Sequence, residues 1–217
     1  MAGLAVRVWA SHPNPHPPAP EADMTAIDYD LEFLEDGRTI ELISIGMVCD
    51  DGREYYAVSA RLADRGWRGW KLRRRIRKHT WLMENVVTSL PKPHGDWNNH
   101  MPQSWLFNYH DPAVKPRKRI AAEVAAFIQA TPDVELWANY GAYDHVALAQ
   151  LWGPMVAPPD GVPMFTHDIQ QEARRLGFRW DELPKQESGE HDALADARHN
   201  QAVRRWLARE AWMEASS

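Results

Sequence analysis

Residues 26–59 hold three consecutive segments with the pattern of β-strands, and this run constrains the fold more than any other part of the chain. In the first segment, 26–33, apolar side chains alternate with Asp and Glu, so the two kinds lie on opposite faces of a strand. The next two segments, 39–49 and 53–59, are rich in apolar and β-branched residues, and each follows a turn that contains Asp-Gly. We therefore expect a sheet that begins with three hairpin-linked strands.

Helical and strand patterns alternate in the rest of the chain, which predicts an α/β fold: a mixed β-sheet flanked by α-helices. The clearest helix is 116–130, which starts at a proline and carries its apolar side chains on one face. A basic helical pattern runs to about residue 79, and Trp67 and Trp70 are expected to form its apolar seam; a platform for stacking bases is the alternative. The other expected elements are a short helix at 81–89, strands at 134–138 and 163–167, and helices at 142–152, 168–176 and 192–209.

The length of 217 residues suits one domain with additions at its ends. Residues 1–23 are rich in proline and are expected to form a disordered tail. Residues 24–210 are expected to form the folded domain, in which 61–115 is a partly basic insertion, and residues 211–217 a C-terminal tail. No apolar run reaches the ~20 residues that a membrane span needs. The lone cysteine, Cys49, excludes an internal disulfide and favours the cytoplasm.

The chain carries a net charge of −5, yet its basic residues are concentrated in one place. Residues 61–78 contain nine Lys or Arg and one acid, so this segment carries +8 and the rest of the chain −13. Such a distribution suits an enzyme that binds cations at its centre and phosphates at its rim. We expect Arg73, Arg74 and Arg75, with Arg77 and Lys78, to contact a substrate backbone away from the scissile bond; a solvated helix face or a protein-contact surface is the alternative.

Acidic residues occupy places that a fold of this kind can bring together. Asp30 and Glu32 stand two apart on the first strand and share one face, where two like charges are costly unless a cation neutralises them. Asp144 follows a strand and opens a helix, at the sheet edge where α/β sites form. Taken alone, the pair also fits an exposed strand face, and Asp144 a helix-capping charge.

A further candidate group stands at the start of the last helix, where His191 precedes Asp196 by five residues. A histidine at a helix N-terminus tends to stay neutral, as a general base must be. Asp192 is a rival ligand, but we assign it as the N-terminal acid of the helix; a capping cluster is the alternative for the whole group. If the four carboxylates and the histidine converge, they suit Mg²⁺ or Mn²⁺ rather than Zn²⁺, because these cations prefer oxygen ligands.

Three motifs, in this order, resemble those of the DEDDh 3′→5′ exonuclease superfamily, whose fold is ribonuclease H-like. They are Asp30-Leu31-Glu32, Asn139-x-x-Ala142-Tyr143-Asp144 and His191-x-Ala193-x-x-Asp196. The resemblance covers about residues 26–208 and is closest to the small ribonuclease T-like exoribonucleases of actinobacteria and their phages. Two features depart from the family. Leu31 stands where a threonine or another small residue is usual, and neither the proline-rich tail nor the basic stretch 61–79 has a clear counterpart.

The resemblance implies an enzyme that hydrolyses RNA from its 3′ end and releases nucleoside 5′-monophosphates. It implies two divalent cations, Mg²⁺ or Mn²⁺, about 3.5–4 Å apart. Asp30 would bridge both cations, while Glu32 and Asp196 would complete one site. Asp144 would hold the other cation, partly through water, and His191 would take a proton from the attacking water. The implied partners are the 3′ ends of single-stranded RNA, or of DNA, and a second copy of the chain in a homodimer.

Substrate contacts near the site are expected from Leu31, Phe33, Asn139 and Tyr143. Aromatic rings stack on terminal bases, although the alternation places Phe33 on the core side of its strand. Three rival functions are a non-catalytic nucleic-acid-binding module of the same fold, an Mg²⁺ phosphohydrolase of small nucleotides, and a 3′→5′ DNA exonuclease. The complete catalytic set argues against the first and the basic stretch against the second. Nothing in the sequence reports on the 2′-hydroxyl.

Overall fold

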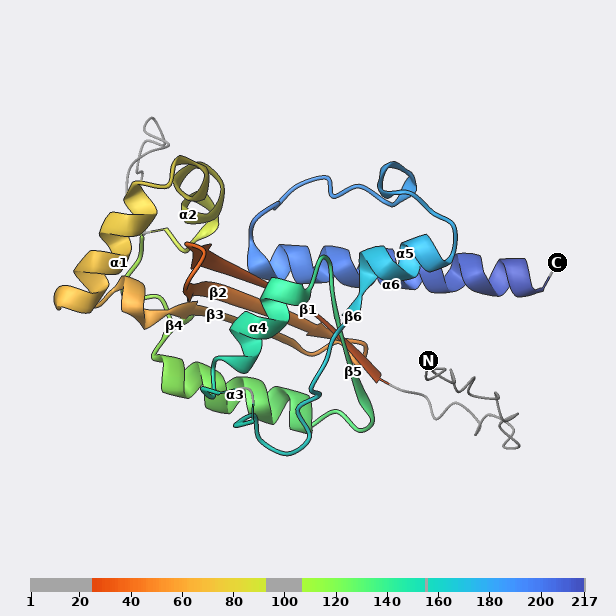
Figure 1. The fold of residues 1–217 in the computed structure, drawn as a ribbon, viewed down its shortest axis with the longest axis horizontal. Helices are drawn as coiled ribbons and strands as arrows, with labels where there is room; N and C mark the ends of the chain where they lie inside the picture. Colours follow the sequence, from red (N-terminus) through yellow and green to blue (C-terminus); the bar gives the residue numbers. More distant parts are fainter. Residues whose placement is uncertain (1–24, 93–106, 155, 217) are drawn as a thin grey trace, which may run out of the picture.

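The computed structural model describes residues 25–92, 107–154 and 156–216. Its centre is a six-stranded sheet in the order β4-β3-β2-β1-β5-β6 (Figure 1). β1 to β3 are joined as antiparallel hairpins, whereas β4, β5 and β6 each run parallel to a neighbour. The strands are β1 Thr25–Glu35, β2 Ile40–Cys49, β3 Glu54–Ser59, β4 Val114–Lys115, β5 Val134–Ala138 and β6 His167–Asp168. The predicted mixed sheet, with its three hairpin-linked strands, is confirmed.

Helices cover both faces of this sheet (Figure 1). α3 and α4 pack on the apolar side of β1, in a core that contains Ile27, Tyr29 and Leu148. The helical elements are η1 Ala60–Leu62, α1 Trp67–Arg77, η2 Leu82–Val86, α2 Val87–Ser89, α3 Arg117–Gln129, α4 Ala142–Ala149, α5 Ile169–Arg175, η3 Trp180–Glu182 and α6 Ala193–Ala215. Within the described ranges, no helix has the length and apolarity that crossing a bilayer requires.

The acidic side of β1 faces α6 instead of solvent. Asp28 is fully buried there and accepts hydrogen bonds from Arg204 of α6 on both carboxylate oxygens, at 2.9 and 2.8 Å. α6 comes this close because Gly46 of β2 has no side chain: a Cβ there would lie 2.2 Å from the carbonyl oxygen of Ala193. The first turn of α6 therefore lies beside Asp30, which is the cross-strand partner of Gly46.

Residues 60–92 form an additional helical layer at one end of the sheet. Its core joins Leu34 and Ile43 of the sheet to Leu72 and Ile76 of α1. In the described part of the expected insertion, the chain is thus packed against the domain through apolar contacts, which burial stabilises. The remainder, 93–106, lies outside the described residues.

The expectation for the two tryptophans of α1 was wrong. Trp67 is 71% exposed and Trp70 43% exposed, and their rings stack on each other with centroids 5.0 Å apart. The buried face of α1 instead carries Gly69 and Leu72. Gly69 lies so close to the chain that a Cβ there would be 2.1 Å from the carbonyl oxygen of Asp64. The small residue decides which face packs, and the indoles remain on the surface.

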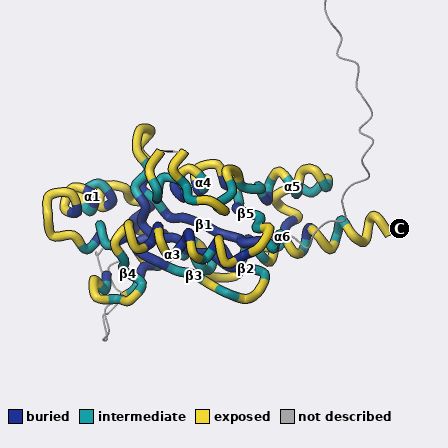
Figure 2. Tube along the Cα trace, turned by 90° about the horizontal axis from the view of Figure 1, so that it is seen from below, coloured by how far each residue is buried: buried dark blue, intermediate teal, exposed yellow. Residues whose placement is uncertain are grey.

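The ends of several elements differ from the expectations. Residues 211–217 were expected to form a tail, but α6 continues to Ala215, and residues 212–216 are exposed (Figure 2). The helix expected at 142–152 ends at Ala149, and the strand expected at 163–167 pairs with β5 only at residues 167 and 168. The tail predicted for residues 1–23 lies outside the described residues.

Candidate active site

β1 and α4 bring the first two acidic motifs together. β5 pairs with β1 only as far as Asp28, so the next backbone groups on that edge of β1 need other partners. The N–H of Leu31 donates to Oδ1 of Asp144 at 2.9 Å, and this hydrogen bond is buried. Asp144 lies in the first turn of α4, where the helix dipole favours a carboxylate. The carboxylate of Asp144 is thereby held beside the strand that carries Asp30 and Glu32.

The start of α6 supplies the rest of the group. Asp192 caps the helix by accepting the N–H groups of Leu194 and Ala195, as predicted. Asp196 accepts the N–H of His191 on Oδ2 at 2.9 Å. Gln186 donates its side-chain amide to Oδ1 of Asp196 at 2.7 Å. Protein donors therefore orient both oxygens of Asp196.

The five residues expected to be catalytic line one cleft of about 320 Å³. They come from β1, α4, the residue before the cap of α6, and α6 itself: Asp30, Glu32, Asp144, His191 and Asp196. Within it, Nδ1 of His191 lies 3.8 Å from Oε1 of Glu32. Glu32, His191 and Asp196 also offer possible ligand atoms that all lie within 4.8 Å of one another. The structure thus brings the whole predicted set together.

Burial and mutual repulsion disfavour the charged forms of these carboxylates. Burial, followed by the charges of Asp196 and Asp144, raises the pKa of Glu32 to about 8. Burial raises the pKa of Asp144 to about 6, against the lowering effect of its hydrogen bond from Leu31. The pKa of Asp30 lies well above its ordinary value, first through burial and then through the charges of Asp144 and Glu32. Burial also raises the pKa of Asp196.

A divalent cation fits this donor set. The cluster consists of carboxylate oxygens, the ligands that hard cations such as Mg²⁺ and Mn²⁺ prefer. Positive charge beside Asp30 and Glu32 would offset the repulsion that, after burial, raises their pKa values.

The expected substrate-binding residues lie in two groups. Leu31 and Asn139 line the cleft. Leu31 is buried, and the side-chain oxygen of Asn139 accepts a hydrogen bond from Gln170 at 2.7 Å. Phe33 and Tyr143 stack on each other with centroids 6.4 Å apart, and Tyr143 is 57% exposed. A β-bulge between Glu32 and Phe33 interrupts the strand alternation at this point.

The expected backbone-binding arginines do not line the cleft. Arg73 donates to the carbonyl oxygens of Leu62 and Asp64 at 2.9 and 2.6 Å, so it supports the turn before α1. Arg75 forms an ion pair with Asp36 at 2.7 Å. Arg74 places its guanidinium over the ring of Trp70, 5.3 Å from the centroid. The sequence places the three residues together, but their side chains have different partners.

Sequence reasoning missed the loop between α5 and α6. Trp180, Lys185 and Gln186 line the cleft from this loop. The ammonium of Lys185 lies 5.5 Å from the centroid of Trp180, which is 51% exposed. Gln186 stands five residues before His191, but this separation forms no pattern that would have predicted the contact.

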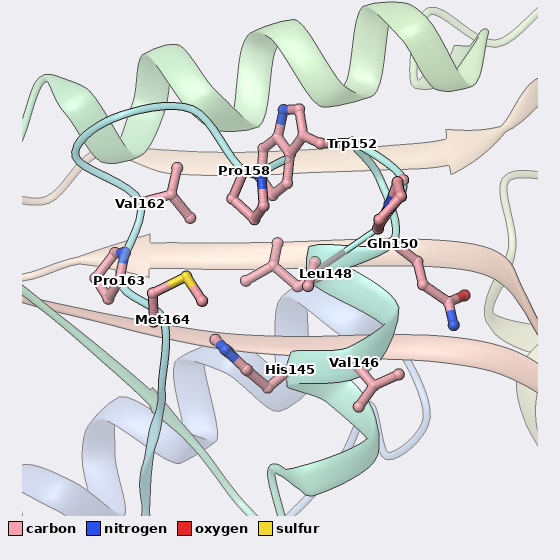
Figure 3. Close-up of a pocket in the computed structure, with 12 residues that line it drawn as sticks. His145, Val146, Leu148, Gln150, Trp152, Pro158, Val162, Pro163 and Met164 are labelled. Atoms are coloured by element: carbon pink, nitrogen blue, oxygen red, sulfur yellow. The ribbon is translucent and has the colours of Figure 1, made fainter. Parts of the chain in front are cut away.

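A second hollow, of about 420 Å³, lies between α4 and residues 150–164 (Figure 3). Its labelled side chains are mostly apolar and include Leu148, Trp152 and Val162. None of the five expected catalytic residues is among those that line it.

A mixed sheet with an acidic cleft at the start of its last helix is the arrangement that the resemblance to the DEDDh 3′→5′ exonucleases predicted. The model of the Rv2179c-like family, a 3′-5′ exoribonuclease domain, matches residues 25–208 of this chain. The chain therefore belongs to the Rv2179c-like 3′-5′ exoribonuclease family, which confirms the predicted exoribonuclease family.

The chain is also similar to curated proteins and to solved structures. The 3′-5′ exoribonuclease Rv2179c of Mycobacterium tuberculosis strain H37Rv is 42% identical over 172 residues, which cover 78% of this chain and 85% of the relative. The 3′-5′ exoribonuclease MT2234.1 of strain CDC 1551 matches with the same values. Exonuclease I in complex with the inhibitor BCBP is 11% identical, with a TM-score of 0.48, covering 84% of this chain and 41% of that one.

Proposed function

We propose that this protein removes nucleotides from the 3′ end of single-stranded RNA by metal-dependent hydrolysis and releases nucleoside 5′-monophosphates. The observation that carries the proposal is the convergence of four carboxylates and one histidine in a single cleft. A non-catalytic binding module would not need such a set, because carboxylates without a bound cation repel phosphate and weaken its binding.

Asp30, Glu32, Asp144 and Asp196 are the residues that would hold two divalent cations, Mg²⁺ or Mn²⁺. Bound there, the cations would neutralise the scissile phosphate and lower the pKa of the attacking water. The protein contributes placement. Asp144 is fixed by the N–H of Leu31, and Asp196 by Gln186 and by the N–H of His191.

His191 is proposed as the general base. Its side chain is 34% exposed, so it is open to the cleft, and Nδ1 faces the carboxylate of Glu32 at 3.8 Å. A neutral imidazole in this position can accept the proton of the attacking water, and Glu32 would stabilise the resulting imidazolium.

The terminal nucleotide is proposed to bind between the cleft residues Leu31 and Asn139 and the stacked pair Phe33 and Tyr143. An exposed ring such as Tyr143 offers a stacking platform for any base. The preference for RNA over DNA rests on the family, whose relatives are named exoribonucleases.

Upstream nucleotides are proposed to contact α1. Three of its exposed cations have no carboxylate within ion-pair distance in the described ranges: Arg68, Lys71 and Arg74. The exposed Trp67 and Trp70 stand on the same helix. Of the arginines that the sequence predicted to contact the substrate, Arg74 is kept in this proposal. Arg73 and Arg75 would have to leave their present partners to bind phosphate.

Two further properties are proposed, a homodimer from the family resemblance and a cytoplasmic location from the lone cysteine. The chain is expected to form a homodimer, which light scattering after gel filtration would test. A cytoplasmic location fits the buried free thiol of Cys49, and cell fractionation would test it.

A ladder assay tests the proposed function. RNA and DNA oligonucleotides of one sequence, labelled at the 5′ end, are incubated with the protein and Mg²⁺ or Mn²⁺, with EDTA as control. The proposal requires single-nucleotide shortening of RNA that EDTA stops. Shortening that starts at the other end, RNA binding without shortening, or a preference for DNA would overturn it.

A further inference from the structure

The backbone of His191 is in a conformation that a non-glycine residue rarely adopts. Its φ is 64°, in the left-handed region, where a Cβ is unfavourable. Such a residue stays in place only when its surroundings hold it there. His191 precedes the cap of α6, so the helix alone does not fix its carbonyl group or its ring.

Two residues from a distant segment make contact with His191. The hydroxyl of Ser89, at the end of α2, lies 2.7 Å from the carbonyl oxygen of His191, across 102 positions of sequence. It also lies 2.8 Å from the carbonyl oxygen of Val86 in its own helix, so its single proton is shared between two acceptors. The ring of Trp81 meets the imidazole edge-on, with centroids 4.7 Å apart and an angle of 71° between the planes. Glu32 and Asp196 complete the surroundings of His191.

The helix that carries Trp81 and Ser89 has a shape that favours both contacts. In a regular α-helix, residues eight apart are rotated by about 80° from alignment. Between these two lies the π-helical turn η2, Leu82–Val86, which advances fewer degrees per residue and reduces that rotation. Trp81 is 47% exposed, while Leu82 and Met83 supply the apolar contacts of the layer. Trp81 therefore contributes more to the surroundings of His191 than to the core.

We propose that Ser89 and Trp81 are positioning residues that hold His191 in its working orientation. The segment 79–89 would thus take part in catalysis through the general base. This inference rests on the proposed role of His191. A base displaced by about 1 Å transfers protons much more slowly, while substrate binding need not change.

The test compares Ser89→Ala and Ser89→Thr with Thr88→Ala as the matched control. Thr88 is exposed on the same helix, and its hydroxyl bonds to Glu84 and Asn85 within that helix. We expect Ser89→Ala to lower kcat about 10- to 100-fold, the scale of a misplaced catalytic group. KM, RNA affinity measured in EDTA and the melting temperature should stay close to wild type. Ser89→Thr, which keeps the hydroxyl, should recover most of the activity.

Trp81 is tested in the same way, with Trp81→Phe and Trp81→Ala against Trp212→Ala. Trp212 is 71% exposed on the last turns of α6. The alanine variant should lose kcat and the phenylalanine variant should retain most of it. A rise in KM with unchanged kcat would overturn the positioning role and make Trp81 a substrate contact. If Thr88→Ala and Ser89→Ala lower kcat equally, the effect of Ser89 is on the stability of the helix and not on His191.

A double-mutant cycle with His191→Ala separates the inference from the proposed function. If Ser89 acts through His191, adding Ser89→Ala to His191→Ala should cause no further loss. If His191→Ala alone retains wild-type turnover, the role of His191 as base fails, and the positioning role fails with it. If His191→Ala is inactive but Ser89→Ala matches wild type, only the positioning inference fails.

Discussion

Replacing Glu32 with glutamine should stabilise the metal-free protein at pH 8.5 and leave its stability near pH 4.5 unchanged. The pKa of Glu32 rises from 4.5 to about 8 on folding, mainly because of burial. The folded chain therefore holds a proton that the unfolded chain releases, and stability is lost as the pH rises from about 4.5 to 8. Glutamine has the same shape and never ionises, so the variant does not share this loss.

The size of the effect follows from the shift. At about 1.36 kcal/mol per pKa unit, the full shift of Glu32 corresponds to a ceiling of about 5 kcal/mol above pH 8. Glu32 is only 8% exposed, so solvent screens its charge little. The titration of Glu32 is coupled to that of Asp144 and Asp196, so part of the pKa shift belongs to the three groups together and not to Glu32 alone. We therefore expect the variant to gain about 2–3 kcal/mol.

Urea unfolding in EDTA at several pH values measures the gain. The control is Glu187→Gln, an exposed glutamate for which no such gain is expected. Adding Mn²⁺ at pH 8.5 should reverse the ranking, since wild type keeps the additional ligand. A stabilisation that is equal at pH 4.5 and 8.5 would attribute the effect to packing and refute the electrostatic account of the cleft.

Three further predictions concern catalysis and RNA binding. Asp30→Asn and Asp196→Asn should each abolish cation-dependent shortening of RNA in the ladder assay while circular dichroism stays unchanged; near-wild-type activity would remove that residue from the site. His191→Ala should lower turnover about 10²–10⁴-fold with unchanged Mn²⁺ affinity by calorimetry, whereas weakened affinity would make it a ligand. Replacing three cations of α1 by alanine should flatten the salt dependence of long-RNA binding by about two units; an equal effect on a dinucleotide would refute the contact. Those cations are Arg68, Lys71 and Arg74.

Local patterns made β1 and its acidic face predictable from sequence. The alternation of residues 26–33 depends only on the strand period, so it places Asp30 and Glu32 on one side without knowledge of the rest of the fold. The cap of α6 is equally local, because Asp192 accepts N–H groups two and three residues ahead. These two features position three of the five expected catalytic residues: Asp30, Glu32 and Asp196.

Contacts between distant segments left no such pattern. The contact between Ser89 and His191 joins residues 102 positions apart, and Trp180 and Lys185 reach the cleft from the segment between α5 and α6. The exposed position of Trp67 has a different, local cause. Hydrophobicity alone favoured its burial, but the approach of Gly69 to the preceding turn decided which side of α1 packs.

α6 links the site to the sheet by two separate means. At its start, small residues allow close contact, with Ala193 against Gly46. Further along, Arg204 binds the buried Asp28, whose pKa burial raises to about 6 although Arg204 lowers it. Because Asp28 and Asp30 stand on the same face of β1, the ion pair fixes the position of α6 relative to the strand that carries the site. A buried ion pair adds little net stability, so its contribution here is the register that sets Asp196 opposite Glu32.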